Sequence, residues 1–159
     1  MSDLTYADVG ATGGELPAGY HHVRESRQIG RGRPTFDRAS EALVTWQMHE
    51  RAGVRLISGP DAASDGQDVA FRWLLLRFEC RVVSVVDEPN RRGFTYGTLA
   101  RHPESGEERF MIEIDERTDV VTATITAFSR PSNLLVRLGG PVLRLVQARM
   151  TQRYLASLT

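Results

Sequence analysis

The four histidines are the residues best suited to acid–base or metal chemistry near neutral pH. They are His21, His22, His49 and His102. His21 and His22 are adjacent, so in a strand their side chains point to opposite faces and cannot bind one metal ion together without a turn. None of the four stands at a spacing typical of a zinc site. We therefore predict neither a metal site nor a cofactor, and expect solvated or hydrogen-bonded histidines.

The segment from His102 to Glu108 brings one histidine close to three glutamates. A His–Glu pair can transfer protons when its surroundings shift the pKa of one member. Turn-forming residues at 102–106, however, predict the tip of a hairpin, where solvent makes a raised pKa hard to maintain. We therefore expect a structural or interface role for this segment and predict no catalytic residue in it.

Cys80 is the single cysteine, which excludes an internal disulfide and a multi-cysteine zinc site. It shares the apolar face of a predicted strand with Phe78 and Val82, a pattern typical of a buried, inert thiol. No Gly-x-Ser-x-Gly elbow is present, so covalent catalysis has little support. A reducing compartment suits such a chain, and we predict a cytoplasmic location.

The charge of the chain argues against nucleic acid as a partner. Twenty basic residues balance twenty acidic ones, which leaves no general attraction to nucleic acid or to an anionic membrane. The Arg-Gly-Arg-Pro sequence at residues 31–34 matches the core of a minor-groove hook, but such hooks work in strongly basic tails. We predict no nucleic-acid partner. No apolar run approaches the roughly 20 residues of a membrane span, and we predict none.

The C-terminal segment, residues 139–158, is the element on which a site would depend most. Its apolar residues recur at helical spacing and form a connected stripe, made of Val142, Leu143, Val146, Met150, Tyr154 and Leu158. Gln147 lies on the same side, so the middle of the stripe is polarisable and can form hydrogen bonds. Arg144, Thr151 and Gln152 are predicted to point mainly elsewhere. We predict a long helix that covers a sheet.

Most of the chain between residues 54 and 130 has the composition of strands. Strands are predicted at 54–58, 94–100 and 120–129, with another that turns Phe110, Ile112 and Ile114 toward the core. The run 69–87 would be about 60 Å long as one strand, far above the usual length. We therefore predict a bulge or turn around residues 74–76.

The first third of the chain is predicted to be less regular. Residues 1–19 are rich in glycine and form an irregular arm, and residues 20–29 suit an edge strand. One shorter helix is predicted near residues 35–52, capped by Thr35 and ended by Gly53. With 159 residues, 41% of them hydrophobic, the chain suits a single domain spanning 1–159. The predicted class is α+β, with a curved antiparallel sheet wrapped around the C-terminal helix.

This order of elements resembles the helix-grip fold of the START and Bet v allergen-like superfamily. Five stretches also resemble an uncharacterised bacterial and plant family, domain-of-unknown-function family nineteen-ninety. They are Leu16-Pro17-Ala18-Gly19-Tyr20, Ile29-Gly30-Arg31-Gly32, Cys80-Arg81-Val82-Val83, Gly93-Phe94-Thr95-Tyr96-Gly97-Thr98-Leu99 and His102-Pro103-Glu104-Ser105-Gly106-Glu107-Glu108. The resemblance covers nearly the whole chain. It implies a compact independent domain and supplies no catalytic residues, because the family has no established activity.

The space between the predicted sheet and the terminal helix is the main candidate site. Large side chains able to line an apolar cavity there are Trp46, Trp73, Tyr96, Phe110, Phe128, Met150 and Tyr154, with Arg130, Gln147 or Tyr154 to orient a polar head. The same side chains can instead meet one another and fill the core.

Three functions follow from this architecture. We favour a non-enzymatic domain that binds a small hydrophobic or amphipathic ligand. The first alternative is a small-molecule enzyme of hydrolase, cyclase or isomerase type in the same cavity, as in some relatives of the superfamily, with Tyr96 or Tyr154 as proton donor and His49 as base. The second alternative is a protein-interaction domain with a filled core, which contacts a partner through the arm or through the open face of the sheet. The apolar residues at 134–138 could add a further contact surface if they are exposed.

Overall fold

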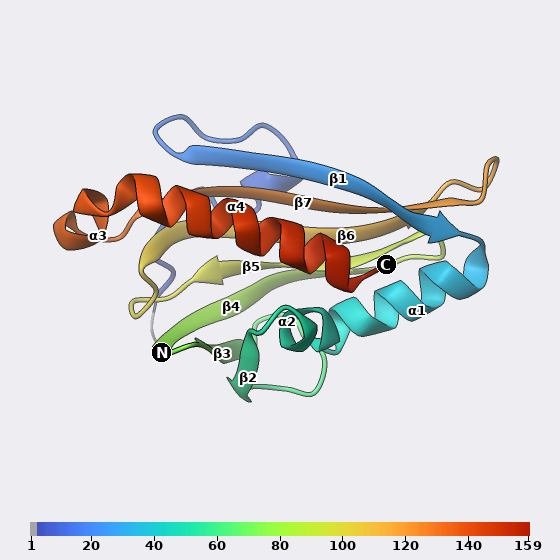
Figure 1. Cartoon of the computed structure of the whole chain (residues 1–159), viewed down its shortest axis with the longest axis horizontal. Helices are drawn as coiled ribbons and strands as arrows, with labels where there is room; N and C mark the ends of the chain where they lie inside the picture. Colours follow the sequence, from blue (N-terminus) through green and yellow to red (C-terminus); the bar gives the residue numbers. More distant parts are fainter. Residues whose placement is uncertain (1–2) are drawn as a thin grey trace.

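The protein is described by a computed structural model that covers residues 3–159. Seven strands form one antiparallel sheet in the order β1-β7-β6-β5-β4-β3-β2. Their bounds are β1 His21–Arg31, β2 Arg55–Ser58, β3 Asp68–Trp73, β4 Leu76–Asp87, β5 Arg91–Thr98, β6 Glu104–Ile114 and β7 Val120–Pro131. Helices α1 (Arg33–Val44), α2 (Gln47–Arg51) and α4 (Gly140–Ser157) lie on one side of the sheet (Figure 1).

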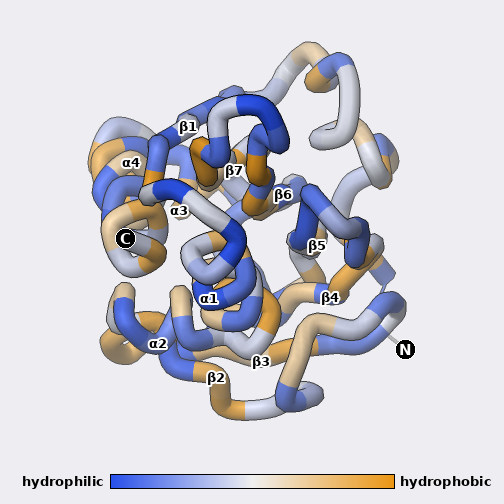
Figure 2. Tube along the Cα trace, turned by 90° about the vertical axis from the view of Figure 1, so that its right-hand side faces the viewer, coloured by the Kyte–Doolittle hydropathy of each residue, from blue (hydrophilic) through white to orange (hydrophobic). Residues whose placement is uncertain are grey.

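The sheet curls around these helices. In the end-on view of Figure 2 it passes from β1 and β7 through β6 and β5 to β3 and β2, with α1, α2 and α4 held inside the curve. The core lies between this face and the helices, and its largest fully buried members include Phe36, Leu43, Trp46, Phe71, Phe94, Phe110, Ile112, Ile125 and Leu155. This arrangement confirms the predicted α+β helix-grip fold.

Helix α4 confirms the predicted C-terminal helix, but only its second half is buried in the core. Tyr154 and Leu155 are buried, whereas Val142 and Leu145 are 67% and 55% exposed. Thr151, which we predicted to point away, is only 2% exposed and was misplaced. The side chains in the first half of the helix are therefore less buried against the sheet than those in the second half.

The helix predicted near residues 35–52 is two helices, so the single-helix prediction is wrong. Helix α1 begins after Gly32 rather than at a Thr35 cap, because Gly32 has a φ of 84° that turns the chain out of β1. Trp46 adopts a left-handed φ of 68° and separates α1 from α2. This turn buries the Trp46 indole, whose Nε1 donates a hydrogen bond to the Pro60 carbonyl at 2.9 Å. Long-range packing thus overrides local helix preference.

The break predicted around residues 74–76 is confirmed. Leu74 has a φ of 54° and forms the tight turn between β3 and β4 with Leu75, both side chains being exposed. The predicted edge position of the first strand is also confirmed, since β1 pairs only with β7. A short helix, α3 (Leu134–Leu138), was not predicted. It joins β7 to α4 and leaves its leucines exposed.

The hairpin tip predicted at residues 102–106 is displaced. β5 ends at Thr98 and β6 begins at Glu104, so Ser105 and Gly106 are strand residues and are buried. The N-terminal arm covers them from the convex side of the sheet. Thr5 donates its amide to the Thr98 carbonyl at 3.1 Å, and Tyr6 packs where a β-carbon at Gly97 would overlap the Tyr6 hydroxyl. The arm is irregular apart from a short 3-10 helix at Ala11–Gly13, as predicted.

Candidate functional site

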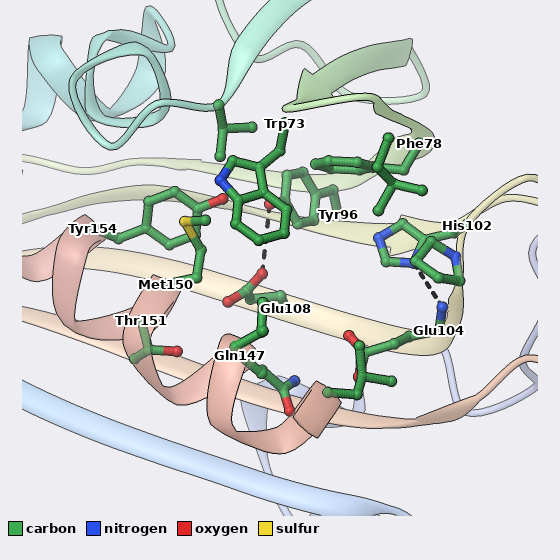
Figure 3. A pocket seen from close by; sticks show the side chains of 15 residues that line it. Trp73, Phe78, Tyr96, His102, Glu104, Glu108, Gln147, Met150, Thr151 and Tyr154 are labelled. Atoms are coloured by element: carbon green, nitrogen blue, oxygen red, sulfur yellow. Dashed lines mark hydrogen bonds between the residues drawn. The ribbon is translucent and has the colours of Figure 1, made fainter. Parts of the chain in front are cut away.

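A cavity of about 140 Å³ lies between α4 and strands β3 to β6 (Figure 3). Its apolar walls include Trp73, Leu76, Phe78, Leu143, Val146 and Met150. Its polar groups are Tyr96, His102, Glu104, Glu108, Gln147, Thr151 and Tyr154. Two of its lining residues remain accessible to solvent: Leu76 at the start of β4 is exposed, and Leu143 in the first half of α4 is partly exposed.

The structure brings five of the nine predicted site residues together around this cavity. Trp73, Tyr96, Gln147, Met150 and Tyr154 all line it (Figure 3). They come from β3, β5 and three successive turns of α4, so no short sequence motif contains them. That these residues bind a ligand stays a prediction.

Two other predicted residues lie one layer deeper. The Trp46 ring packs edge-on against Phe71 and Phe94, at centroid distances of 5.6 and 5.1 Å. Phe110 contacts Tyr96 and is buried beneath it, with ring centroids 5.3 Å apart. Both residues support the walls of the cavity but do not line it.

Phe128 and Arg130 lie on the opposite, convex face of the sheet. Phe128 pairs in register with Glu107, and its ring packs against Tyr6 and Tyr20 at 5.6 and 5.0 Å. The Arg130 guanidinium lies 4.7 Å from the centre of the Tyr20 ring. Placing these two residues under the helix was wrong, because alternation along β7 turns Ile125 toward the core and Phe128 away from it.

Glu108 is the polar residue at the inner end of the cavity that the sequence reasoning missed. Its carboxylate lies 3.4 Å from the Tyr96 hydroxyl. Burial, with a smaller effect from the negative charge of Glu104, raises the pKa of Glu108 to about 8. The small part of its surface that stays accessible faces the cavity. At neutral pH the structure therefore places a largely protonated carboxyl group at a ligand-sized space.

A signal for Glu108 was present in the strand pattern. Residues 110, 112 and 114 were predicted to face the core, and Glu108 has the same parity in the same strand. The predicted hairpin tip at 102–106 concealed this, because it placed the beginning of β6 in solvent. The expectation of a solvated His–Glu segment is therefore wrong.

His49 lies behind Tyr96 rather than on the cavity wall. Its Nε2 is 3.2 Å from the Tyr96 hydroxyl, and its ring stacks on Phe71 at 4.8 Å. Burial lowers the pKa of His49 to about 3, so the imidazole is neutral and a weak base. Its Nδ1 has no hydrogen-bond partner among residues 3–159. Tyr96 therefore links a buried neutral histidine to the protonated Glu108.

The hydroxyls beside Glu108 act as donors rather than acids. Burial raises the pKa of both Tyr96 and Tyr154 well above the usual value, and each is raised further by neighbouring groups that include Glu108. At the other end of the cavity, burial lowers the pKa of His102 to about 4, and its Nδ1 accepts the Glu104 amide at 3.0 Å. The site is thus polar but uncharged apart from Glu104, whose pKa burial also raises.

Residues 3–159 give little support for a metal site, a reactive thiol or a membrane-spanning helix. Within residues 3–159, no three His, Cys, Asp or Glu side chains are grouped closely enough to hold a metal ion. Cys80 is a buried free thiol, and burial raises its pKa. In the same part of the chain, no helix is both long and apolar enough to cross a membrane. Arg33, in the Arg-Gly-Arg-Pro sequence at residues 31–34, donates to the Asn90 side chain at 3.0 Å.

Comparison with known proteins decides the family. The profile of a domain of unknown function, DUF1990, matches residues 5–157. The chain belongs to the DUF1990 family. A UPF0548 protein of Deinococcus radiodurans is 31% identical, over 94% of this chain and 83% of that protein. A UPF0548 protein of Arabidopsis thaliana is 30% identical, over 75% of this chain and 62% of that protein.

Solved structures show the same fold at low sequence identity. A hypothetical protein of Helicobacter pylori aligns with a TM-score of 0.65 and 10% identity, over 99% of this chain and 95% of that one. The major latex-like protein 151 of Panax ginseng aligns with a TM-score of 0.52 and 15% identity, over 88% of this chain and 98% of that one. The DUF1990 chain therefore has the helix-grip architecture that its sequence resembles.

Proposed function

We propose that the protein binds a small hydrophobic or amphipathic molecule in the cavity beneath α4. The observation that carries this proposal is an apolar-walled space of about 140 Å³ that ends at a protonated carboxyl group. Protein cores rarely leave voids much larger than a water molecule. An engineered apolar cavity of about 150 Å³ binds benzene, so this space suits one aromatic ring or a short alkyl chain.

The polar end of the cavity favours a particular ligand chemistry. A neutral carboxyl such as that of Glu108 can donate one hydrogen bond and accept another. The Tyr96 hydroxyl donates its one proton to the Glu108 carboxyl at 3.4 Å. A ligand with an apolar ring or chain and a hydroxyl or carbonyl group near its inner end would satisfy these groups.

The test is to fill the cavity and measure binding of a small apolar probe. Val146 lines the cavity, whereas Leu145 is exposed on the same turn of α4, so Val146→Trp and Leu145→Trp form a matched pair. We expect saturable broadening of the 19F signal of fluorobenzene with the wild type and with Leu145→Trp. Val146→Trp should weaken binding by at least about tenfold, because the indole occupies the space. Equal binding by both variants, or none by the wild type, overturns the proposal.

A second candidate function is acid–base catalysis in the same cavity. The observation that favours it is the pKa of about 8 for Glu108, since a group that titrates near the working pH transfers protons efficiently. Glu108 would be the acid and Tyr96 its hydrogen-bonding neighbour. His49 is not favoured as the base, because its pKa is about 3 and Tyr96 separates it from the cavity. 13C NMR of the Glu108 carboxyl tests this candidate, and a carboxyl ionised throughout the neutral range excludes it.

A protein-interaction role gains one supporting observation, the exposed leucines of α3. Leu135 and Leu138 are about four-fifths exposed, at 81% and 79%. Contiguous exposed apolar side chains are typical of surfaces that contact a partner or a membrane.

The cytoplasmic location stays a prediction as well, supported by the single reduced and buried Cys80.

A further inference from the structure

A second hollow adjoins the cavity on the far side of α4. It is a groove of about 850 Å³ where α3 and the start of α4 pass the ends of β1 and β7. Five cationic or titratable basic side chains line it, namely His21, His22, Arg130, Arg137 and Arg144. Glu104 is the one acidic residue among its lining residues.

Three arginines gather in this groove without a carboxylate partner in the described part of the chain, whereas four arginines of β4 and β5 form ion pairs. Arg81 forms an ion pair with Asp68 at 2.6 Å, and Arg92 contacts two aspartates. Among residues 3–159, no carboxylate lies within 4.0 Å of the guanidinium of Arg130, Arg137 or Arg144. The segment 120–159 contains five arginines and no acidic residue, so this end of a neutral protein is locally positive.

The one acidic residue in the groove offsets only one of its three arginine charges. Glu104 accepts a hydrogen bond from the Ser129 hydroxyl at 3.3 Å. The positive field is also felt by His21, whose pKa is lowered by burial and then by Arg144 and His22. Unpaired guanidinium groups of this kind suit carboxylates and phosphates, which accept two parallel hydrogen bonds from the planar fork.

The groove and the cavity share a wall. Glu104, Leu143 and Gln147 line both spaces. Gln147 stands between them and donates from Nε2 to the Ser129 hydroxyl at 3.0 Å. Since the cavity accommodates only about one ring or a short chain, the groove beyond Gln147 offers space for the remainder of a larger ligand.

We propose that the groove is an anion site that receives the carboxylate or phosphate head of an amphiphile whose apolar end occupies the cavity. The ligand class is thereby narrowed from small apolar molecules to amphipathic anions. The cavity half of this inference rests on the proposed function, whereas the anion site rests on the unpaired arginines alone. The anionic head can come from a free metabolite or from a lipid headgroup in a bilayer, because the chemistry of recognition is the same.

The experiment compares three probes by titration calorimetry: hexyl phosphate, hexanol and inorganic phosphate. We expect wild-type protein to bind hexyl phosphate at least about tenfold more tightly than hexanol, because the charge-assisted hydrogen bonds are added to the same apolar contact. The double variant Arg137→Gln/Arg144→Gln should lose that difference and bind hexanol as the wild type does. Arg149→Gln is the matched control, since Arg149 is an exposed arginine of α4 outside the groove.

The outcomes separate the two proposals. The anion site is overturned if the wild type binds hexyl phosphate no more tightly than hexanol. It is also overturned if Arg149→Gln loses the difference as the double variant does. Failure of hexanol to bind overturns the cavity proposal, and loss of inorganic phosphate binding in the double variant then still supports the anion site. Retention on vesicles of phosphatidylcholine with phosphatidylglycerol, but not of phosphatidylcholine alone, identifies a lipid headgroup as the source, provided that the double variant is not retained.

Discussion

Glu107 and Glu108 are neighbours in β6, yet they meet opposite environments because successive strand residues face opposite sides of a sheet. Glu107 faces the N-terminal arm and accepts four hydrogen bonds, from the Tyr6 hydroxyl, the Gly10 amide and both the amide and hydroxyl of Thr12. Glu108 faces the cavity, and among residues 3–159 its carboxyl accepts one hydrogen bond, from the Tyr96 hydroxyl. A buried carboxylate with so few donors favours its neutral form.

The raised pKa of Glu108 predicts a specific dependence of stability on pH. The folded-state pKa is about 8, against an ordinary value of 4.5, so between these values the folded protein holds a proton that the unfolded chain has released. The free energy of unfolding then falls as pH rises, by about 1.4 kcal/mol per pH unit, and levels off above pH 8. His49 and His102 act in the opposite direction, but only below their ordinary value of 6.5.

Urea denaturation at pH 6.5 and pH 8 measures this effect, because the contribution of those histidines is the same in the wild type and in Glu108→Gln. We expect the wild type to lose stability between the two values and Glu108→Gln to lose much less, because glutamine has no proton to release. Glu113→Gln, an exposed position in the same strand, is the control and should behave like the wild type. Parallel pH dependence of wild type and Glu108→Gln would show that Glu108 titrates normally.

At the scale of elements, the convex face of the sheet is organised by the irregular N-terminal arm. The arm has little secondary structure of its own, so its backbone donors at Gly10 and Thr12 depend on the Glu107 carboxylate. Ser105 also donates to the Thr5 carbonyl at 2.9 Å. These contacts join residues about a hundred positions apart, and they bury the beginning of β6, which would otherwise be an exposed hairpin end.

Weakening the hydrogen bonds between Glu107 and the N-terminal arm should release the arm while leaving the sheet intact. We expect Glu107→Gln to lower the free energy of unfolding by about 2–3 kcal/mol, since charge-assisted hydrogen bonds are lost and buried donors lose their acceptor. Tyr6→Phe removes one of the four bonds and should cost about 1 kcal/mol. Hydrogen exchange should show faster amide exchange at Gly10 and Thr12 in Glu107→Gln. Unchanged protection of these two amides would mean that other contacts hold the arm.

For the molecule as a whole, the exposed apolar residues are concentrated in two segments. Of the ten exposed large hydrophobic residues among residues 3–159, eight belong to the β3–β4 turn with the first residue of β4, or to α3 and the first half of α4. They are Leu74, Leu75, Leu76, Leu134, Leu135, Leu138, Val142 and Leu145. Such a concentration is unusual for a free surface.

Because these side chains are exposed, they should contribute to association rather than to stability. We expect Leu135→Gln/Leu138→Gln to change the free energy of unfolding by less than about 0.5 kcal/mol per site, whereas Leu155→Ala in the core should cost about 2–5 kcal/mol. If the surface contacts other proteins, sedimentation velocity over a concentration series should show self-association of the wild type that the double variant lacks. A wild type that stays monomeric throughout removes this support for an interaction role.

The sequence by itself determined the strands of the meander and the long C-terminal helix, but not the division of α1 from α2 or the presence of α3. Apolar periodicity identified α4, the meander of strands and the break at Leu74, because helical and strand spacing depend on residues close in the chain. Turn chemistry and the resemblance to the family led to the helix-grip architecture. Five of the nine predicted cavity residues were correctly placed beside one space, since strand alternation and helix phase are local properties.

The tertiary structure decided the features that depend on long-range contacts. Trp46 leaves the helical conformation because its indole is buried against Phe71 and Phe94, and no local pattern encodes that packing. Phe128 is covered on the convex face by Tyr6, a contact between segments more than a hundred residues apart that local pattern does not encode. The pKa of Glu108 depends on how much protein surrounds the carboxyl and how few donors reach it, which follows from how distant segments pack.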